Sequence, residues 1–233
     1  KTFGKDNKVL QGVNLTLNKG EDLVVLGRSG SGKSVTIKCI VGLIEPDKGE
    51  IKVFDENVLH IPKNELNAIR VRIGFLFQSG ALYDSMSVRE NLEFPLRRHT
   101  KKFGVIEDTT PLVMEALESV GLAHAIDLMP NELSGGMKRR IALARTLILK
   151  PKIILYDEPT TGLDPITSKE IVLLMNSIQK QYNTSSIIIT HDVDCAKVIA
   201  NRMILLIDGV NYIEGTFDEL ASSTDPKVQA FFK

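Results

Sequence analysis

The feature that most constrains this chain is GRSGSGKS at residues 27–34, which follows directly on the apolar run DLVVL. An apolar strand that turns through a glycine-rich loop into a helix is the context that a phosphate-binding loop requires. The glycines let backbone N–H groups converge on phosphate oxygens, Lys33 can reach the β- and γ-phosphates, and Ser34 can ligate Mg²⁺. A chance match is the alternative, and the flanking strand and helix argue against it. The predicted nucleotide-binding residues are Gly27, Arg28, Ser29, Gly30, Ser31, Gly32, Lys33, Ser34 and Val35.

Short apolar runs alternate with amphipathic stretches, as in KIILYDEP followed by TSKEIVLLMNSIQKQY and SSIIITHD followed by DCAKVIAN. This alternation predicts an α/β fold with a central, mainly parallel sheet covered on both faces. GEIKVFDENV and DGVNYIEG predict antiparallel strands and hairpins at the edges. Residues 80–130 carry helical patterns, broken by the basic stretch RRHTKKFG. We expect one domain over residues 1–233, with a core at 1–79 and 151–233 and a helical subdomain inserted at about 80–150.

Composition excludes several classes of function. The 29 basic residues balance 29 acidic ones, so we expect no nucleic-acid partner. The 43% hydrophobic and 25% charged content is that of an ordinary soluble globular protein. No apolar run approaches the ~20 residues that span a bilayer, so work at a membrane would need a partner. Cys39 and Cys195 lie in apolar helical patterns, which favours reduced core thiols in a cytoplasmic protein.

Polar residues follow several of the predicted strands, and ligands of parallel sheets bind at the carboxyl ends of strands. After IILY, Asp157 can hold Mg²⁺ and Glu158 can orient or deprotonate an attacking water, although the pair could instead cap the next element. His191 ends another strand and is either catalytic or an ordinary surface or core residue. Gln78 could reach Mg²⁺ or the water through its amide, or be a polar strand end. The remaining histidines, His60, His99 and His124, are interpreted as solvated.

A second candidate anion site lies in LSGGMKRRIALARTL at residues 133–147. Ser134 and two glycines open a predicted helix, whose free N–H groups and dipole favour negative charge. Taken alone, the stretch could equally be a helix cap at Ser134 followed by a solvated basic face made by Lys138, Arg139 and Arg140. The residues do not explain why one chain needs two sites for the same kind of ligand.

All these motifs, in this order, resemble the nucleotide-binding subunit of ATP-binding cassette (ABC) transporters over essentially the whole chain. GRSGSGKS resembles Walker A, Gln78 the Q-loop, LSGGM the ABC signature and IILYDE Walker B. GLDP at residues 162–165 resembles the D-loop, and His191 the switch histidine. The resemblance places Phe3 where the family stacks an aromatic ring on adenine, although Phe3 alone could be a core or rim residue. We expect that platform to be incomplete, because whatever precedes Phe3 is missing.

The resemblance implies an ATPase fold and a function. Two copies would pair head to tail, so that Ser134, Gly135 and Gly136 bind the γ-phosphate held by the second copy, which accounts for the two anion sites. The chain would hydrolyse ATP to ADP and phosphate, with Glu158 as general base and His191 steadying the γ-phosphate and water. The ligands of Mg²⁺ would be Ser34, Gln78 and Asp157, while Lys138, Arg139 and Arg140 would be structural.

Within the family, the chain is most similar to the ATPase subunits of Mla and Mce-associated phospholipid transporters. LFQSGALYDSMSVRENLEFPL, MPNELSGGMKRR, GLDPITS and DPKVQAFF carry this likeness. It implies a place on the cytoplasmic face of the inner membrane, a permease as partner and, through the permease, an Mce-type protein. The permease groove would be lined by Leu82, Tyr83, Phe94 and Leu96, unless these pack within the helical subdomain. Alternatives are an amino-acid importer, a lipoprotein extractor, or a soluble non-transport ABC ATPase.

Overall fold

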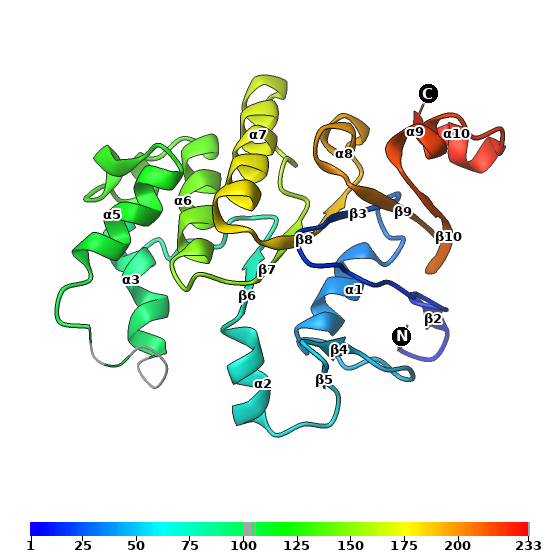
Figure 1. Ribbon diagram of the computed structural model, residues 1–233, viewed down its shortest axis with the longest axis horizontal. Coiled ribbons are helices and arrows are strands. Elements are labelled where there is room, and N and C mark those ends of the chain that lie inside the picture. The colour runs from blue at the N-terminus through cyan, green and yellow to red at the C-terminus, as the bar shows by residue number, and fades with distance from the viewer. Residues whose placement is uncertain (100–103, 105, 233) are drawn as a thin grey trace.

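The computed structural model describes residues 1–99, 104 and 106–232. At its centre is a six-stranded sheet in the order β10-β9-β3-β8-β7-β6 (Figure 1). Its strands are β3 (Asp22–Leu26), β6 (Ile73–Leu76), β7 (Ile153–Asp157), β8 (Ser185–Thr190), β9 (Arg202–Ile207) and β10 (Val210–Gly215). All pairings in this sheet are parallel except that of β10 with β9. The predicted mainly parallel α/β sheet is therefore confirmed.

Two small antiparallel sheets accompany the central one. The first pairs β1 (Thr2–Phe3) with β2 (Asn7–Lys8), and the second pairs β4 (Lys52–Val53) with β5 (Glu56–Asn57). Phe54 and Asp55 form the tip between β4 and β5 with φ of 53° and 65°. Two consecutive positive φ angles are what a tight hairpin turn needs to follow the strand twist. The hairpins expected in GEIKVFDENV and DGVNYIEG are thus present as β4–β5 and β9–β10.

Several helices begin at polar residues that cap them. Ser134 accepts a hydrogen bond from the backbone N–H of Met137, and Asp164 accepts from Ile166 and Thr167. The helices are α1 (Lys33–Ile40), α2 (Lys63–Arg70), α3 (Val88–Arg98), α5 (Thr110–Ser119), α6 (Gly135–Leu147), α7 (Pro165–Tyr182), α8 (Val193–Ile199), α9 (Phe217–Ala221) and α10 (Pro226–Phe232). Within the described ranges, no helix is both long and apolar enough to cross a bilayer.

Successive residues of a strand point to opposite faces of the sheet. Their apolar side chains therefore form two separate clusters, one on each face. Ile37 of α1 belongs to the cluster that contains Val25 and Leu155. Ile141 of α6 belongs to the other, which contains Ile154 and takes residues of α7 and α8 as well. Helices α1 and α6 therefore cover opposite faces of the sheet, and this separates the two candidate anion sites.

The segment between β6 and β7 is helical. Figure 1 shows α3, α5 and α6 grouped together beside the β6 edge of the sheet. The boundaries predicted for this subdomain, about 80–150, stay a prediction, and residues 100–103 of the expected break lie outside the described residues. Cys39 and Cys195 are both free and buried, as expected of core thiols.

Asp22 at the start of β3 is a buried acid on the face that α6, α7 and α8 cover. It is 3% exposed, and its Oδ1 has no hydrogen-bond partner among the described residues. Burial and the nearby Glu21 carboxylate raise the pKa of Asp22 to about 6, against a smaller opposing effect of the Ser186 hydroxyl. The folded protein therefore holds this proton at pH values where the unfolded chain has lost it.

Asp22→Asn is expected to stabilise the fold at neutral pH. Since the pKa of Asp22 is raised on folding, its ionisation lowers the free energy of unfolding as pH rises from about 4 to about 6, by up to about 3 kcal/mol. The neutral amide avoids this loss, so the variant should gain about 1–3 kcal/mol at pH 7.5 and roughly half as much at pH 5. Urea unfolding of both proteins at the two pH values measures the difference. An equal gain at both pH values would contradict the assignment to Asp22.

Candidate functional site

The loop at residues 27–34 joins β3 to α1 with its backbone drawn tightly together. A Cβ on Gly27 would lie 2.6 Å from the carbonyl oxygen of Leu206, so only glycine fits there. Gly32 caps α1 with φ of 100° and supplies no side-chain cap, which leaves the first N–H groups of the helix available. The hydroxyl of Ser31 is buried without a hydrogen-bond partner in the described part of the chain. Free donors around a helix start fit a phosphate group.

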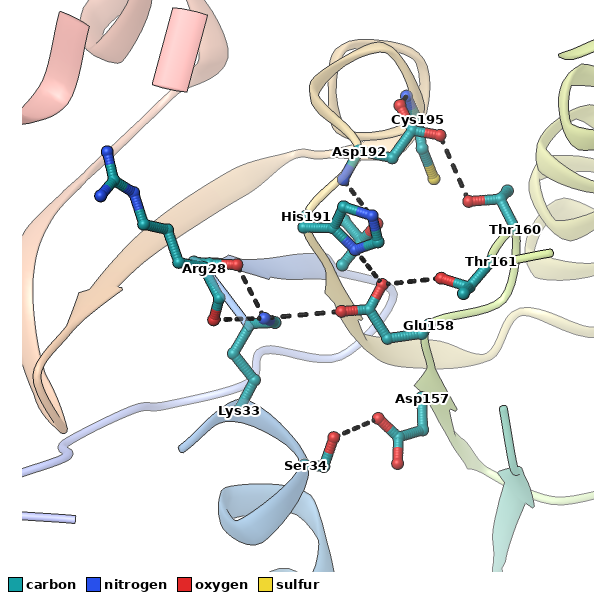
Figure 2. Close-up of polar contacts among 12 residues, drawn as sticks. Arg28, Lys33, Ser34, Asp157, Glu158, Thr160, Thr161, His191, Asp192 and Cys195 are labelled. Atoms are coloured by element: carbon teal, nitrogen blue, oxygen red, sulfur yellow. Dashed lines mark hydrogen bonds and ion pairs between the residues drawn. The ribbon is translucent and has the colours of Figure 1, made fainter. Parts of the chain in front are cut away.

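Lys33 lies beneath this loop and is only 5% exposed. Its Nζ donates to the carbonyl oxygens of Gly27 at 2.7 Å and Arg28 at 3.0 Å, and lies 3.5 Å from Oε1 of Glu158. Burial lowers the pKa of Lys33, while the carboxylates of Glu158 and Asp157 act in the opposite direction. The guanidinium of Arg28 points away from this group (Figure 2). The loop therefore presents one buried ammonium group, next to a carboxylate.

Glu158 is the centre of the hydrogen-bonded group in Figure 2. Its Oε2 lies 2.7 Å from Nδ1 of His191 and accepts a hydrogen bond from the hydroxyl of Thr161 at 3.1 Å. The backbone of Glu158 has φ of 52°, while its N–H still donates to Ile189 in β8. A non-glycine residue in this conformation is strained, and such strain persists where the surroundings hold a residue in a required orientation. The carboxylate is thus held from three sides.

Asp157 and Gln78 provide oxygen atoms beside the loop. Oδ1 of Asp157 accepts a hydrogen bond of 2.6 Å from the hydroxyl of Ser34. Gln78 is exposed and lines an open pocket together with Lys38, Phe77, Ser79, Asp157, Thr161 and Gly162. Carboxylate, hydroxyl and amide oxygens are the ligands that Mg²⁺ prefers, so this donor set fits that ion.

The second candidate anion site, at residues 134–136, belongs to α6. Ser134 and Gly135 are exposed at the start of the helix. A Cβ on Gly136 would lie 2.7 Å from Cγ2 of Thr167, so this glycine allows α6 to approach the first turn of α7. The structure thus gathers the loop, Asp157, Glu158, His191 and Gln78 at one site, whereas residues 134–136 open a helix on the other face of the sheet.

The predicted adenine contact of Phe3 and the permease contacts of Leu82, Tyr83 and Phe94 stay predictions, whereas the prediction for Leu96 is contradicted. Phe3 is 38% exposed in β1. Tyr83 is 44% exposed, with its ring centroid 4.9 Å from that of the half-buried Phe94, and Leu82 is half-buried. Leu96 is only 3% exposed and packs in the core cluster, so its prediction as a groove residue is wrong. The helical period turns Leu96 toward the core, four residues after the buried Leu92.

Two residues make contacts at this site that the sequence did not predict. Thr161, which holds Glu158, follows it by three residues in DEPTT, a spacing that carries no recognisable signal. Arg139 is only 6% exposed, which excludes the alternative of a solvated basic face for this residue and agrees with its expected structural role. A signal did exist, because Arg139 precedes the buried Ala142 and Leu143 by three and four residues and so shares their face of α6.

A glycine-rich loop between a central strand and a helix, with acidic residues at the end of β7 facing it, defines a P-loop nucleoside triphosphatase. Residues 10–161 match the ABC transporter family, and the full chain is 39% identical to a curated member. The chain belongs to the ABC transporter family and is an ABC ATPase.

Two relatives illustrate the likeness. The chain is 39% identical over 234 residues to the intermembrane phospholipid transport system ATP-binding protein MlaF of Haemophilus influenzae, covering 100% of this chain and 88% of that protein. It is also 39% identical over 231 residues to the probable ribonucleotide transport ATP-binding protein mkl of Mycobacterium tuberculosis, covering 99% of this chain and 64% of that one.

Solved structures agree with this assignment. The ATP-binding cassette MJ0796, a dimer in a post-hydrolysis state bound to ADP and Pi, aligns with a TM-score of 0.83 and 32% identity, covering 93% of this chain and 95% of that one. CbiO1 from Clostridium perfringens, part of the ABC transporter complex cbiONQ, aligns with a TM-score of 0.84 and 29% identity, covering 92% and 84%.

Proposed function

We propose that this chain hydrolyses ATP in a head-to-tail dimer and drives a membrane permease that moves phospholipid. The observation that carries the hydrolytic part is the carboxylate of Glu158, held between Lys33, His191 and Thr161. A general base must lie within hydrogen-bond reach of the proton that it takes. It must also be held in the correct orientation before the substrate binds. Glu158 meets the second condition through its three contacts.

In this mechanism each side chain has a separate task. Glu158 orients the attacking water and accepts its proton, and His191, whose Nδ1 already contacts Glu158, steadies the water and the γ-phosphate. Lys33 and the backbone N–H groups of the loop neutralise the charge that builds up on the transferred phosphoryl group. Mg²⁺, held by Ser34, Asp157 and Gln78, would add positive charge at the phosphates.

The arrangement of the two anion sites supports the proposed dimer. Residues 134–136 open a helix on the face of the sheet opposite α1, so they are proposed to serve the nucleotide of a second copy. Backbone N–H groups and the helix dipole would then bind the γ-phosphate in trans. ATP would favour the closed dimer, because only that state makes both sets of contacts. Support comes from the dimeric cassette MJ0796.

We propose the cargo and the partner from the similarity to MlaF, whose name states phospholipid transport. This chain covers 88% of that protein. Ribonucleotide transport, named for mkl, is the second candidate, at equal identity but with 64% of that protein covered. The permease is proposed to dock on the cytoplasmic side of the inner membrane, against Leu82, Tyr83 and Phe94, and to lead to an Mce-type protein.

Affinity purification of the tagged chain from detergent-solubilised membranes of its host, with mass spectrometry of proteins and lipids, tests the cargo. We expect a multi-span permease with bound phospholipid. Recovery of a permease with bound ribonucleotide would favour the second candidate. Recovery of ribosomes or DNA-repair proteins without a permease would contradict transport altogether. Turnover of ATP by the same preparation, lost on chelation of Mg²⁺ by EDTA, tests the hydrolytic part separately.

A further inference from the structure

Arg139 lies on α6, five residues after the serine that opens the helix, and its guanidinium reaches two main-chain oxygens on different segments. One nitrogen, Nη1, donates to the carbonyl oxygen of Phe77 at 2.9 Å. The other, Nη2, donates to the carbonyl oxygen of Thr161 at 3.3 Å. Arg139 therefore joins three parts of the chain: α6, the end of β6 and the loop after β7.

The two acceptor residues lie in the wall of one pocket, together with Gln78 and Asp157. Phe77 immediately precedes Gln78, and the hydroxyl of Thr161 donates to Oε2 of Glu158. Since a guanidinium is planar and rigid, its two donors fix the separation of the two carbonyl groups that it binds. A lysine ammonium at this position could follow one carbonyl but would not define the distance between both.

The burial of Arg139 distinguishes it from its neighbour on the same helix. Arg139 is 6% exposed, and its guanidinium donates to the neutral carbonyl groups of Phe77 and Thr161. Burial lowers the pKa of this guanidinium. The side chain of Arg140 is 26% exposed and pairs with the carboxylate of Glu170 at 2.7 Å. A buried cation is costly unless its donors are used, so Arg139 must keep both contacts to be tolerated.

We propose that Arg139 is a positioning residue that connects the helix meeting the partner's nucleotide to the carboxylate that acts on the chain's own nucleotide. This inference rests on the proposed head-to-tail ATPase. Residues 134–136 would bind the γ-phosphate of the nucleotide on the partner. Arg139, on the same helix, binds the carbonyl oxygen of Thr161, and the hydroxyl of Thr161 binds Glu158 at the chain's own nucleotide. Docking of α6 on the partner's nucleotide thereby sets the geometry of Glu158 and Gln78 for hydrolysis.

The first test compares Arg139→Met, Arg139→Lys and the matched control Arg140→Met in the full chain. Steady-state kinetics with ATP give kcat and KM, calorimetry with a non-hydrolysable ATP analogue gives Kd, and thermal unfolding reports the fold. For Arg139→Met we expect kcat to fall between about tenfold and a hundredfold, because small misplacements of catalytic groups have effects of this size. Kd should stay within about twofold, and Arg139→Lys should recover part of kcat.

Each outcome of this test has a definite meaning. Wild-type kcat in Arg139→Met would overturn the inference, as would an equal fall of kcat in Arg140→Met. If Arg139→Met fails to fold, Arg139→Lys carries the test, because it keeps the charge and the length of the side chain but not the paired donors. A wild-type protein that turns over no ATP would instead contradict the proposed function.

A double-mutant cycle with Thr161→Val tests the route from Arg139 to Glu158. If Arg139 acts through Thr161, the kcat loss of the double variant should be smaller than the product of the two single losses. Multiplicative losses would show that the two residues act independently and would overturn this route. The fold is monitored in all variants by the same thermal unfolding measurement.

Discussion

Replacing Glu158 with glutamine is expected to lower kcat for ATP hydrolysis by about a thousandfold, within the range that a general base contributes. The amide has almost the same shape and can still accept a hydrogen bond from Thr161 through its oxygen, but it cannot take a proton from water. ATP binding should persist, since the loop and Lys33 are unchanged, and Kd should stay within about twofold. Calorimetry with ATP and a phosphate-release assay measure the two quantities.

The matched control is Glu115→Gln, which removes a carboxylate from α5 that pairs with Lys150 at 2.9 Å on the surface. An exposed ion pair of this kind contributes little, so kcat should be unchanged. If the Glu158 variant turned over ATP near the wild-type rate, Glu158 would lose its role as base. Loss of ATP binding together with hydrolysis would place Glu158 in binding instead.

The parts of the site that could be predicted are those whose chemistry is local in the chain. The strand, the glycine-rich loop and α1 are contiguous, so DLVVLGRSGSGKS shows the loop and the placement of Lys33 and Ser34 together. Asp157, Glu158 and His191 could be placed because the ends of parallel strands share one edge. Their hydrogen bonds join residues far apart in sequence, as between Ser34 and Asp157, but the sheet topology already implies that they meet.

The parts that could not be predicted depend on packing between distant segments. Nothing local indicates that Glu158 has φ of 52° or that Thr161 holds its carboxylate. Arg139 looks like one member of a basic run. The helical period places it on the buried face of α6, but nothing local indicates that its guanidinium binds the carbonyl oxygens of Phe77 and Thr161. The prediction for Leu96 failed for a different reason. An apolar residue near a predicted docking segment can face either the partner or the core, and its phase on the helix, not a contact between distant segments, decides between them.

Gly135→Asp is expected to abolish ATP hydrolysis while leaving the single chain folded and able to bind ATP. The nearest atom to an added Cβ at Gly135 is Cδ2 of Leu163 at 3.7 Å, an ordinary contact, so the chain itself has room for a side chain. A carboxylate in the first turn of α6 is compatible with the helix dipole. In the proposed dimer, however, that carboxylate would meet the γ-phosphate of the partner's nucleotide, and like charges would oppose closure. We expect kcat to fall at least about a hundredfold with Kd for ATP within about twofold.

Mixing this variant with Lys33→Ala distinguishes a trans site from a cis site. Each variant alone should be inactive, because every site in its dimer lacks either Gly135 or Lys33. A head-to-tail mixed dimer contains one site built from the intact loop of the Gly135→Asp chain and the intact residues 134–136 of the Lys33→Ala chain. Hydrolysis in the mixture should therefore rise well above that of either variant, which a phosphate-release assay at a range of mixing ratios measures. If each chain served its own nucleotide, no pairing could restore a complete site and the mixture would stay inactive.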